Sequence, residues 1–501
     1  MKKAKRIYAL LGILLVACVA TFVISRQEEE KEKIKNSDEI ILTIDSEAVT
    51  ALSWEYDEVS LAFHKTGSTT SGDDETSVEK SSADVSEETL TNETWLYDED
   101  EAFPVDEGKI ADLLEQFQEF GVAFEIDEVE DYAQYGLDNP TCTIKITAGE
   151  QEYTIQLGAY STMDSQRYVS IGDGKVYLVS HDPMEDYEIE LRDMIKHDEI
   201  SGLADATAIR FAGTQNYEIL YEEESTNTYC EDDVYFTDNK PLDSTMVGDY
   251  LDTVAGVGLS KYVSYNVTEE ELAAFGLEEP DLTITVDYTV TNEEEEEITE
   301  TFVLNLGRNQ EELEAALETE DEDEIYSVTA YARVGDSQIV YEITSLEYKN
   351  LTENSYDDFR HKEVLTASFE DIYQIDITLE GESYTISSTT EDDVKTWKYG
   401  NNEDISVYGL ETAIQALEST EFTSEDATDK EEISLKVYLE NENYPEIDIA
   451  LYRYDGSECI AFVDGESFAR VSRSDVVDLI EAVNSIILDK SADDATEAED
   501  E

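Results

Sequence analysis

Basic residues are scarce in this sequence. Only 32 lysines and arginines stand against 123 aspartates and glutamates, which gives a formal net charge of −91 over 501 residues. Such a field repels nucleic acid phosphates, and no Lys/Arg-rich stripe interrupts it, so the composition argues against nucleic-acid binding. Weak association with divalent cations is compatible with this charge, although solubility or a saline, extracellular habitat also explains it.

Cysteine is also scarce, with four residues in the chain. Cys18 lies inside an apolar N-terminal segment, and the other three, Cys142, Cys230 and Cys459, are an odd and widely spaced set without CxxC spacing. We therefore expect hydrophobic cores, rather than a disulfide framework, to hold the fold together.

Sequence motifs for known chemistries are missing. The four histidines include no HExxH or His-x-His pattern, and there is no G-x-S-x-G elbow or P-loop. Gly256-Val257-Gly258 lacks a dinucleotide fingerprint and better suits a helix end, and Glu320–Glu324 lacks the glycine turn of an EF-hand. His197 and His361 recur at equivalent repeat positions, which favours a packing or turn role. The sequence predicts no catalytic, cofactor-binding or metal-binding residue and no cofactor.

One long apolar run is present, from Ile7 to Ile24, with basic residues before it and three glutamates shortly after it. At about 1.5 Å per residue it is just long enough to cross a bilayer, and the charge asymmetry directs the rest of the chain outward. We predict a membrane anchor at residues 1–26 and a juxtamembrane linker at 27–45. Two alternatives remain open: a lipoprotein modified at Cys18 and a cleaved secretory signal.

An internal repeat is the most informative feature. Tyr135–Pro140 and Phe275–Pro280 share the pattern aromatic-Gly-Leu-x-x-Pro, and each precedes a strand-like segment. Farther along, Tyr153–Gly158 matches Phe302–Gly307 after a shift of 149 residues, nine more than the 140 that separates the first pair. The added residues lie where the second copy carries the acidic run Glu293–Glu297, and we interpret them as a lengthened hairpin loop. We interpret the aromatic-Gly-Leu-x-x-Pro element as a structural corner rather than a ligand-binding loop.

A third, divergent copy follows. It lacks the corner pattern but keeps Trp397-Lys398-Tyr399 where the first copy has Trp95-Leu96-Tyr97. A segment rich in serine, threonine and acids, residues 66–94, is predicted to be a disordered insertion in the first copy. The predicted boundaries are 46–200 for the first unit, 201–366 for the second, 367–489 for the third and 490–501 for an acidic disordered tail.

Hydrophobic periodicity predicts an α+β fold. Segments such as Leu52–Phe63, Thr141–Ile146 and Val176–Val179 alternate at the strand period of two. Other apolar residues recur three or four apart, as on one face of a helix. These are Ile110, Leu113, Leu114, Phe117 and Phe120 in the first unit, Met246, Tyr250, Leu251 and Val254 in the second, and Ile414 and Leu417 in the third. Each unit is therefore predicted to be a twisted antiparallel sheet with one packed helix.

The N-terminal anchor, the repeated units and the corner leading to a strand that ends in Leu-Gly resemble an uncharacterised bacterial family. Its members are often encoded beside genes for gliding-motility-type ABC transporters, and the domain is one of unknown function. The resemblance covers most of residues 46–366. It implies an envelope-exposed accessory of an ABC-type export system, with no catalytic residues to carry over.

Three functions are compatible with these observations. The first is a non-enzymatic, membrane-anchored accessory or scaffold protein on the outer side of the membrane, whose partners are ABC transporter subunits or other envelope proteins. The second is a glycan or cell-wall polymer binding module, for which exposed aromatic residues on one sheet face would be the distinguishing sign. The third is a hydrolase that uses an unrecognised carboxylate site.

Overall fold

The structure is a computed structural model of the chain. It describes residues 39–66, 94–127, 129–179, 181–228, 230, 232–292, 295–319, 321–392, 394–427, 430–441 and 444–497. No helix in these ranges is both long enough and apolar enough to span a membrane. The predicted anchor at residues 1–26, and residues 67–93 of the predicted disordered insertion, lie outside the described residues.

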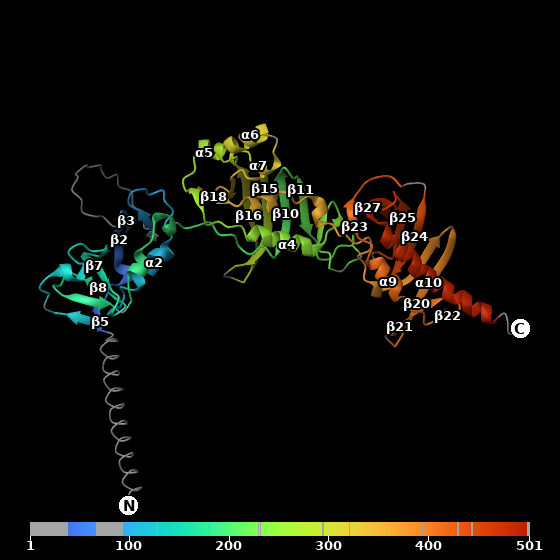
Figure 1. Cartoon of the computed structure of the whole chain (residues 1–501), viewed down its shortest axis with the longest axis horizontal. Coiled ribbons are helices and arrows are strands. Elements are labelled where there is room, and N and C mark those ends of the chain that lie inside the picture. The colour runs from blue at the N-terminus through green and yellow to red at the C-terminus, as the bar shows by residue number, and fades with distance from the viewer. Residues whose placement is uncertain are drawn as a thin grey trace, which may run out of the picture. The chain divides into compact units, whose positions relative to one another are not determined.

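In the described residues, three antiparallel sheets of nine strands each follow one another along the chain (Figure 1). The first sheet contains β1 (Glu39–Leu42), β2 (Val49–Tyr56), β3 (Val59–Lys65), β4 (Trp95–Tyr97), β5 (Phe120–Ile126), β6 (Cys142–Ala148), β7 (Gln151–Ser161), β8 (Gln166–Ser170) and β9 (Val176–Val179). The second contains β10 (Ala206–Gly213), β11 (Tyr217–Tyr221), β12 (Tyr235–Thr237), β13 (Lys240–Pro241), β14 (Tyr262–Ser264), β15 (Leu282–Thr291), β16 (Glu297–Arg308), β17 (Ala330–Val334) and β18 (Val340–Ile343). The third contains β19 (Ile372–Leu379), β20 (Glu382–Glu391), β21 (Val394–Tyr399), β22 (Asn402–Glu403), β23 (Ser419–Phe422), β24 (Glu431–Leu439), β25 (Glu446–Arg453), β26 (Glu458–Val463) and β27 (Glu466–Ser472).

The three sheets share one strand order. The second runs β13-β12-β11-β10-β15-β16-β17-β18-β14 and the third runs β22-β21-β20-β19-β24-β25-β26-β27-β23. The first, read from its β4 edge, is β4-β3-β2-β6-β7-β8-β9-β5-β1, which matches them strand for strand except at the two edges. The predicted tandem repetition of antiparallel sheets is confirmed, and it includes the divergent third copy.

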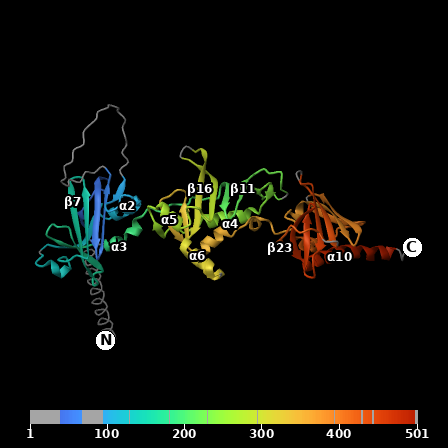
Figure 2. The ribbon, with the colours of Figure 1, turned by 90° about the horizontal axis from the view of Figure 1, so that it is seen from above.

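Helices cover one face of each sheet. They are α2 (Glu107–Glu115) and the short α3 (Met184–Tyr187) in the first, α4 (Ser244–Ala255) and α8 (Ser345–Thr352) in the second, and α9 (Tyr408–Gln415) and α10 (Arg473–Glu497) in the third. The two helices of a sheet also meet each other: the Tyr187 hydroxyl donates to Leu113 O at 3.0 Å, and the Tyr250 hydroxyl donates to Leu351 O at 2.9 Å. Figure 2 shows α10 lying along the third sheet. The mixed α+β class is confirmed, but in the described part of the chain this face of each sheet carries two helices rather than the single one expected.

The main cores lie between these helices and the sheets. In the second sheet, Ile209, Ile284 and Leu304 from neighbouring strands are fully buried together with residues of α4. The third sheet builds the same layer from its own strands with α9 and α10. Asp106 and Asp243 start the first helix of their sheets, because each side chain accepts two backbone N–H groups of the first turn.

Several local predictions need correction. Leu52–Phe63 is not one strand but the hairpin of β2 and β3, which turns at Asp57 with a φ of 46°. Met246 is 40% exposed, and the neighbouring Val247 is buried in its place. Phe120 belongs to β5 rather than to a helix. Helix α10 continues to Glu497, into the acidic tail predicted to be disordered.

The chain divides into two compact units, residues 1–197, which contain the first sheet, and 198–501, which contain the second and third.

Candidate functional site

The corner motif closes the second face of the first two sheets. Gly136 and Gly276 have left-handed backbones with φ of 67° and 69°. The aromatic residue before each glycine packs on a tyrosine in a strand of its own sheet: Tyr135 contacts Tyr168 of β8 at 5.0 Å between ring centroids, and Phe275 contacts Tyr331 of β17 at 4.6 Å. In the second sheet Leu277, Tyr331 and Val340 form a small separate core there.

A second glycine makes this packing possible. A Cβ atom on Gly158 would lie 2.3 Å from Tyr135 O, and a Cβ atom on Gly307 would lie 2.4 Å from Gly276 O. No side chain fits at such a distance, so the Leu-Gly strand ending and the corner are two halves of one contact. These contacts support the structural interpretation of the motif.

The connection that follows β7, β16 and β25 differs among the three sheets. The first sheet joins β7 to β8 through residues 162–165, and the third joins β25 to β26 through residues 454–457. The second sheet places residues 309–329 at this point, including α6 (Gln310–Thr319) and α7 (Glu322–Tyr326). We call residues 309–329 the helical insertion. Figure 1 shows α6 and α7 beside α5 (Glu269–Ala274), and α6 contacts both of its neighbours.

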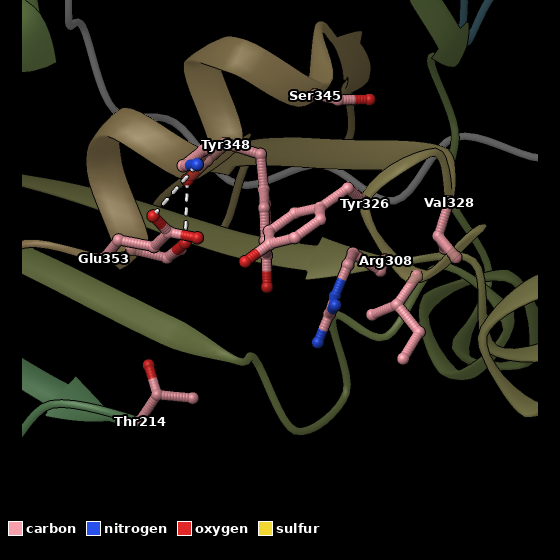
Figure 3. A pocket seen from close by; sticks show the side chains of 10 residues that line it. Thr214, Arg308, Tyr326, Val328, Ser345, Tyr348 and Glu353 are labelled. Carbon is pink, nitrogen blue, oxygen red and sulfur yellow. Dashed lines mark hydrogen bonds and ion pairs between the residues drawn. The ribbon is translucent and has the colours of Figure 1, made fainter. Parts of the chain in front are cut away.

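The helical insertion forms one wall of a cavity of about 180 Å³, here called the Tyr348 cavity (Figure 3). Ile325, Tyr326 and Val328 come from the insertion, and α8 supplies the opposite side. The remaining lining residues are Thr214, Arg308, Ser345, Tyr348, Lys349, Thr352 and Glu353. An apolar cavity of about 150 Å³ is large enough for one aromatic ring, so this space can accept a single large side chain or a small molecule.

An ion pair fixes the floor of the cavity. Arg308 Nε lies 3.0 Å from Asp281 Oδ2, and the Tyr348 hydroxyl donates to the same oxygen at 2.6 Å. The Arg308 guanidinium also lies 5.1 Å from the centre of the Tyr348 ring. Burial, and then the hydrogen bond to the Asp281 carboxylate, raise the pKa of Tyr348, so this phenol stays protonated and acts as a donor.

The mouth of the cavity is aromatic and cationic. Lys349 Nζ lies 5.0 Å from the centre of the Tyr326 ring and 3.5 Å from a carboxylate oxygen of Glu353. Tyr326 is 51% exposed. Two further exposed apolar residues, Leu317 on α6 and Leu346 on α8, lie on the helices that form or flank this wall. A partly open aromatic cavity can bind a ligand through stacking and apolar contact, and the ion pair of Lys349 with Glu353 lies beside it.

The residues predicted to be structural lie apart from this cavity. His361 Nε2 is 2.7 Å from Asp233 Oδ1, and the Thr228 hydroxyl donates to the other carboxylate oxygen at 2.8 Å. Asp233 is the one acidic side chain buried among the residues that the structure describes. Burial lowers the pKa of His361, but the hydrogen bond and charge of Asp233 outweigh this effect and raise the pKa above its ordinary value.

Within the described ranges, no group of three metal-ligating side chains has the geometry of a metal site, and Glu320 of the acidic run falls outside those ranges. Cys142, Cys230 and Cys459 are free thiols. Gly256 ends α4, as its sequence context indicated.

The sequence did contain a signal for the cavity. The shift between the first two copies is 149 residues at Gly158 and Gly307, but 163 at Gly172 and Gly335. Fourteen additional residues must therefore lie between these positions in the second copy, and the helical insertion lies in this interval. Which α8 side chains face it could not be read from the shift.

A comparison with protein families finds one match: the family described as a domain of unknown function (DUF4340) matches residues 95–228 and 236–437. The match therefore continues into the third sheet, beyond the range of the resemblance seen in the sequence. Searches of curated proteins and of solved structures found no match.

Proposed function

This chain belongs to the DUF4340 family, a domain of unknown function, and we propose that it is a non-enzymatic accessory or scaffold protein of the bacterial cell envelope. In this proposal the N-terminal segment anchors the chain in the membrane, the three sheets lie on the outer side, and an ABC-type transporter is the partner. The transporter association rests on the resemblance of the repeat sequence to proteins encoded beside such transporters.

The single observation that carries the scaffold role is that one of three equivalent sheets has an added helical segment and a cavity beside it. Three sheets keep one strand order, whereas the helical insertion and the Tyr348 cavity belong to the second sheet. A repeated framework with one added surface suits a protein that holds a binding site in place.

The cavity is proposed to receive an anchoring side chain of the partner. Nine residues of the insertion are acidic, whereas Tyr326, Leu317 and Leu346 are exposed and apolar. An apolar anchor flanked by basic residues would match this surface in shape and charge.

The test is co-purification of the detergent-solubilised full-length chain from its own membranes. In one variant, residues 309–329 are replaced by the Thr162–Ser165 turn of the first sheet. In the control, the acidic hairpin tip of residues 292–296 is shortened, which also removes negative charge but leaves the cavity intact.

The proposal predicts that a transporter subunit co-purifies with the natural chain and with the control variant. It should not co-purify with the variant that carries the exchanged turn. Recovery of no transporter subunit by the natural chain, under conditions that preserve other envelope complexes, contradicts the transporter role. Equal recovery with the exchanged turn contradicts the role of the cavity.

A further inference from the structure

The third sheet lacks the corner that covers the other two. Its β23 and β24 are joined by residues 423–430, which contain no aromatic-Gly-Leu-x-x-Pro sequence. The strand position of Gly307 is taken by Tyr452: each follows a leucine, and each leucine pairs with the strand before it, Leu306 with Leu282 and Leu451 with Ile433. A corner backbone cannot approach at a tyrosine as it does at a glycine, so this face of the third sheet is built differently.

Strand alternation shows which residues occupy that face. The core side carries Leu435, Val437 and Ile449, so their neighbours along the strands point the other way. Cross-strand pairs place Asp376 beside Lys436, Lys436 beside Asp448, and Ala450 beside Phe462. These side chains line a hollow of about 730 Å³, here called the Tyr452 hollow.

The Tyr452 hollow has an aromatic wall. The Tyr452 and Phe462 rings meet edge to face, with centroids 5.5 Å apart. Both side chains are partly exposed. A rigid pair of rings at the side of a shallow hollow offers an apolar surface on which a flat, weakly polar ring can stack.

The rest of the lining is polar and mostly acidic. Asp376, Glu431, Asp448 and Asp464 line the hollow, and among the described residues of the lining Lys436 is the one cation. Lys436 is neutralised by Glu446 at 2.8 Å and by Asp448 at 3.4 Å. Asp376 already accepts hydrogen bonds from Thr385 and Tyr438, so the hollow offers a ligand the remaining carboxylate lone pairs and a net negative charge. Both favour donors and cations, and the charge repels anionic polymers.

We propose that the Tyr452 hollow binds an oligosaccharide that contains amino sugars with free amino groups. A pyranose ring has an apolar C–H face for the aromatic pair, hydroxyl donors for the carboxylates, and an ammonium group that complements the acidic lining. A volume of several hundred Å³ suits a short oligosaccharide rather than a single small molecule. The site is separate from the Tyr348 cavity and does not depend on the transporter proposal.

The experiment is a calorimetric titration of the purified full-length chain with a glucosamine tetramer, and with its N-acetylated form. The expected result is tighter binding of the free amine. Two variants that preserve the net charge, Tyr452→Ala and Phe462→Ala, should each weaken binding by about tenfold. Tyr452→Phe retains the ring and should bind nearly as the natural chain does.

A matched control separates the site from general attraction to an acidic protein. Tyr221→Ala removes a tyrosine that is 40% exposed on the second sheet and should leave binding unchanged. Hydrogen exchange of the third sheet in each variant checks that it is folded. Binding that survives both Tyr452→Ala and Phe462→Ala in folded protein is charge attraction alone and overturns the proposal, as does no binding at all. A tetralysine peptide that binds as tightly, and with the same dependence on Tyr452, overturns the assignment to a saccharide.

Discussion

At the scale of single residues, two glycines of the second sheet differ in whether a side chain would fit: the backbone of the corner lies against Gly307, whereas the space around Gly248 is open. In Gly307→Ala the new Cβ atom would lie 2.4 Å from Gly276 O, so the corner must move away from the sheet. We expect the second sheet to lose about 1–3 kcal/mol of stability, which is typical of overpacking. Hydrogen exchange of peptides from β15 and β16 would measure this loss locally.

Gly248 provides the matched control in the same sheet. It lies within α4, and a Cβ atom there would meet nothing within 4 Å. Gly248→Ala should therefore stabilise the helix by about 0.5–1 kcal/mol. Equal effects of the two substitutions would contradict the proposed contact between the corner and the strand end.

His361 gives a prediction for pH. Its pKa is raised in the folded chain, chiefly by Asp233, with Asp243 and Glu363 acting in the same direction against the effect of burial. A raised folded pKa means that the stabilisation is complete below the ordinary value of 6.5 and is lost as the pH rises through the folded pKa. In the natural chain, the protection of β11 and β12 from hydrogen exchange should fall as the pH rises through this window. In His361→Gln, the protection should depend less on pH. If protection fell by the same amount in His361→Gln, the pH dependence would come from other groups than His361.

At the scale of secondary structure elements, the cap of α8 should control one wall of the Tyr348 cavity. The Glu347 backbone N–H donates to the Thr344 hydroxyl at 3.2 Å, and the Thr344 N–H donates to the Glu347 carboxylate at 2.8 Å. Glu347 also accepts the Gly258 N–H at 2.9 Å, which ties α8 to the end of α4.

Thr344→Ala removes the hydroxyl half of this capping box. We expect a loss of about 1 kcal/mol of local stability in α8, seen as faster hydrogen exchange of residues 345–352. Thr344→Ser keeps the hydroxyl and serves as the control. Equal hydrogen-exchange rates of residues 345–352 in the two variants would show that the Thr344 cap does not stabilise α8.

The elements also show what sequence can and cannot predict. Strand alternation and the corner were readable because they depend on local spacing and on glycine backbones. The second helix of the second and third sheets was missed because its position depends on contacts with a helix that lies far away in sequence. These contacts join α8 to α4 and α10 to α9. Met246 was misplaced by one residue because Val247 continues the same apolar face equally well. The Tyr348 cavity needs two elements from different parts of the chain, so only its insertion was detectable.

At the scale of the whole molecule, the division into two compact units predicts independent folding. Residues 1–197 have their own sheet, helices and core. A fragment of residues 39–197 should keep the hydrogen-exchange protection that the same residues have in the full chain. Exchange at unfolded rates throughout β2 and β6 would show that the first sheet depends on the rest of the protein.

The repetition also explains how one protein could carry two unlike surfaces. Equivalent sheets leave their connections free to vary, as the helical insertion of the second and the missing corner of the third illustrate. The shared layer of strands and helices is kept in all three sheets, while the connections on the other face differ from sheet to sheet.

The most direct measurement of the scaffold account is photo-crosslinking in living cells from a photoreactive amino acid placed at position 326. Position 221, an exposed tyrosine on β11 of the second sheet, is the control. The account predicts that position 326 captures a transporter subunit and that position 221 does not. Capture from both positions alike, or from neither while the protein is present in the membrane, would contradict it.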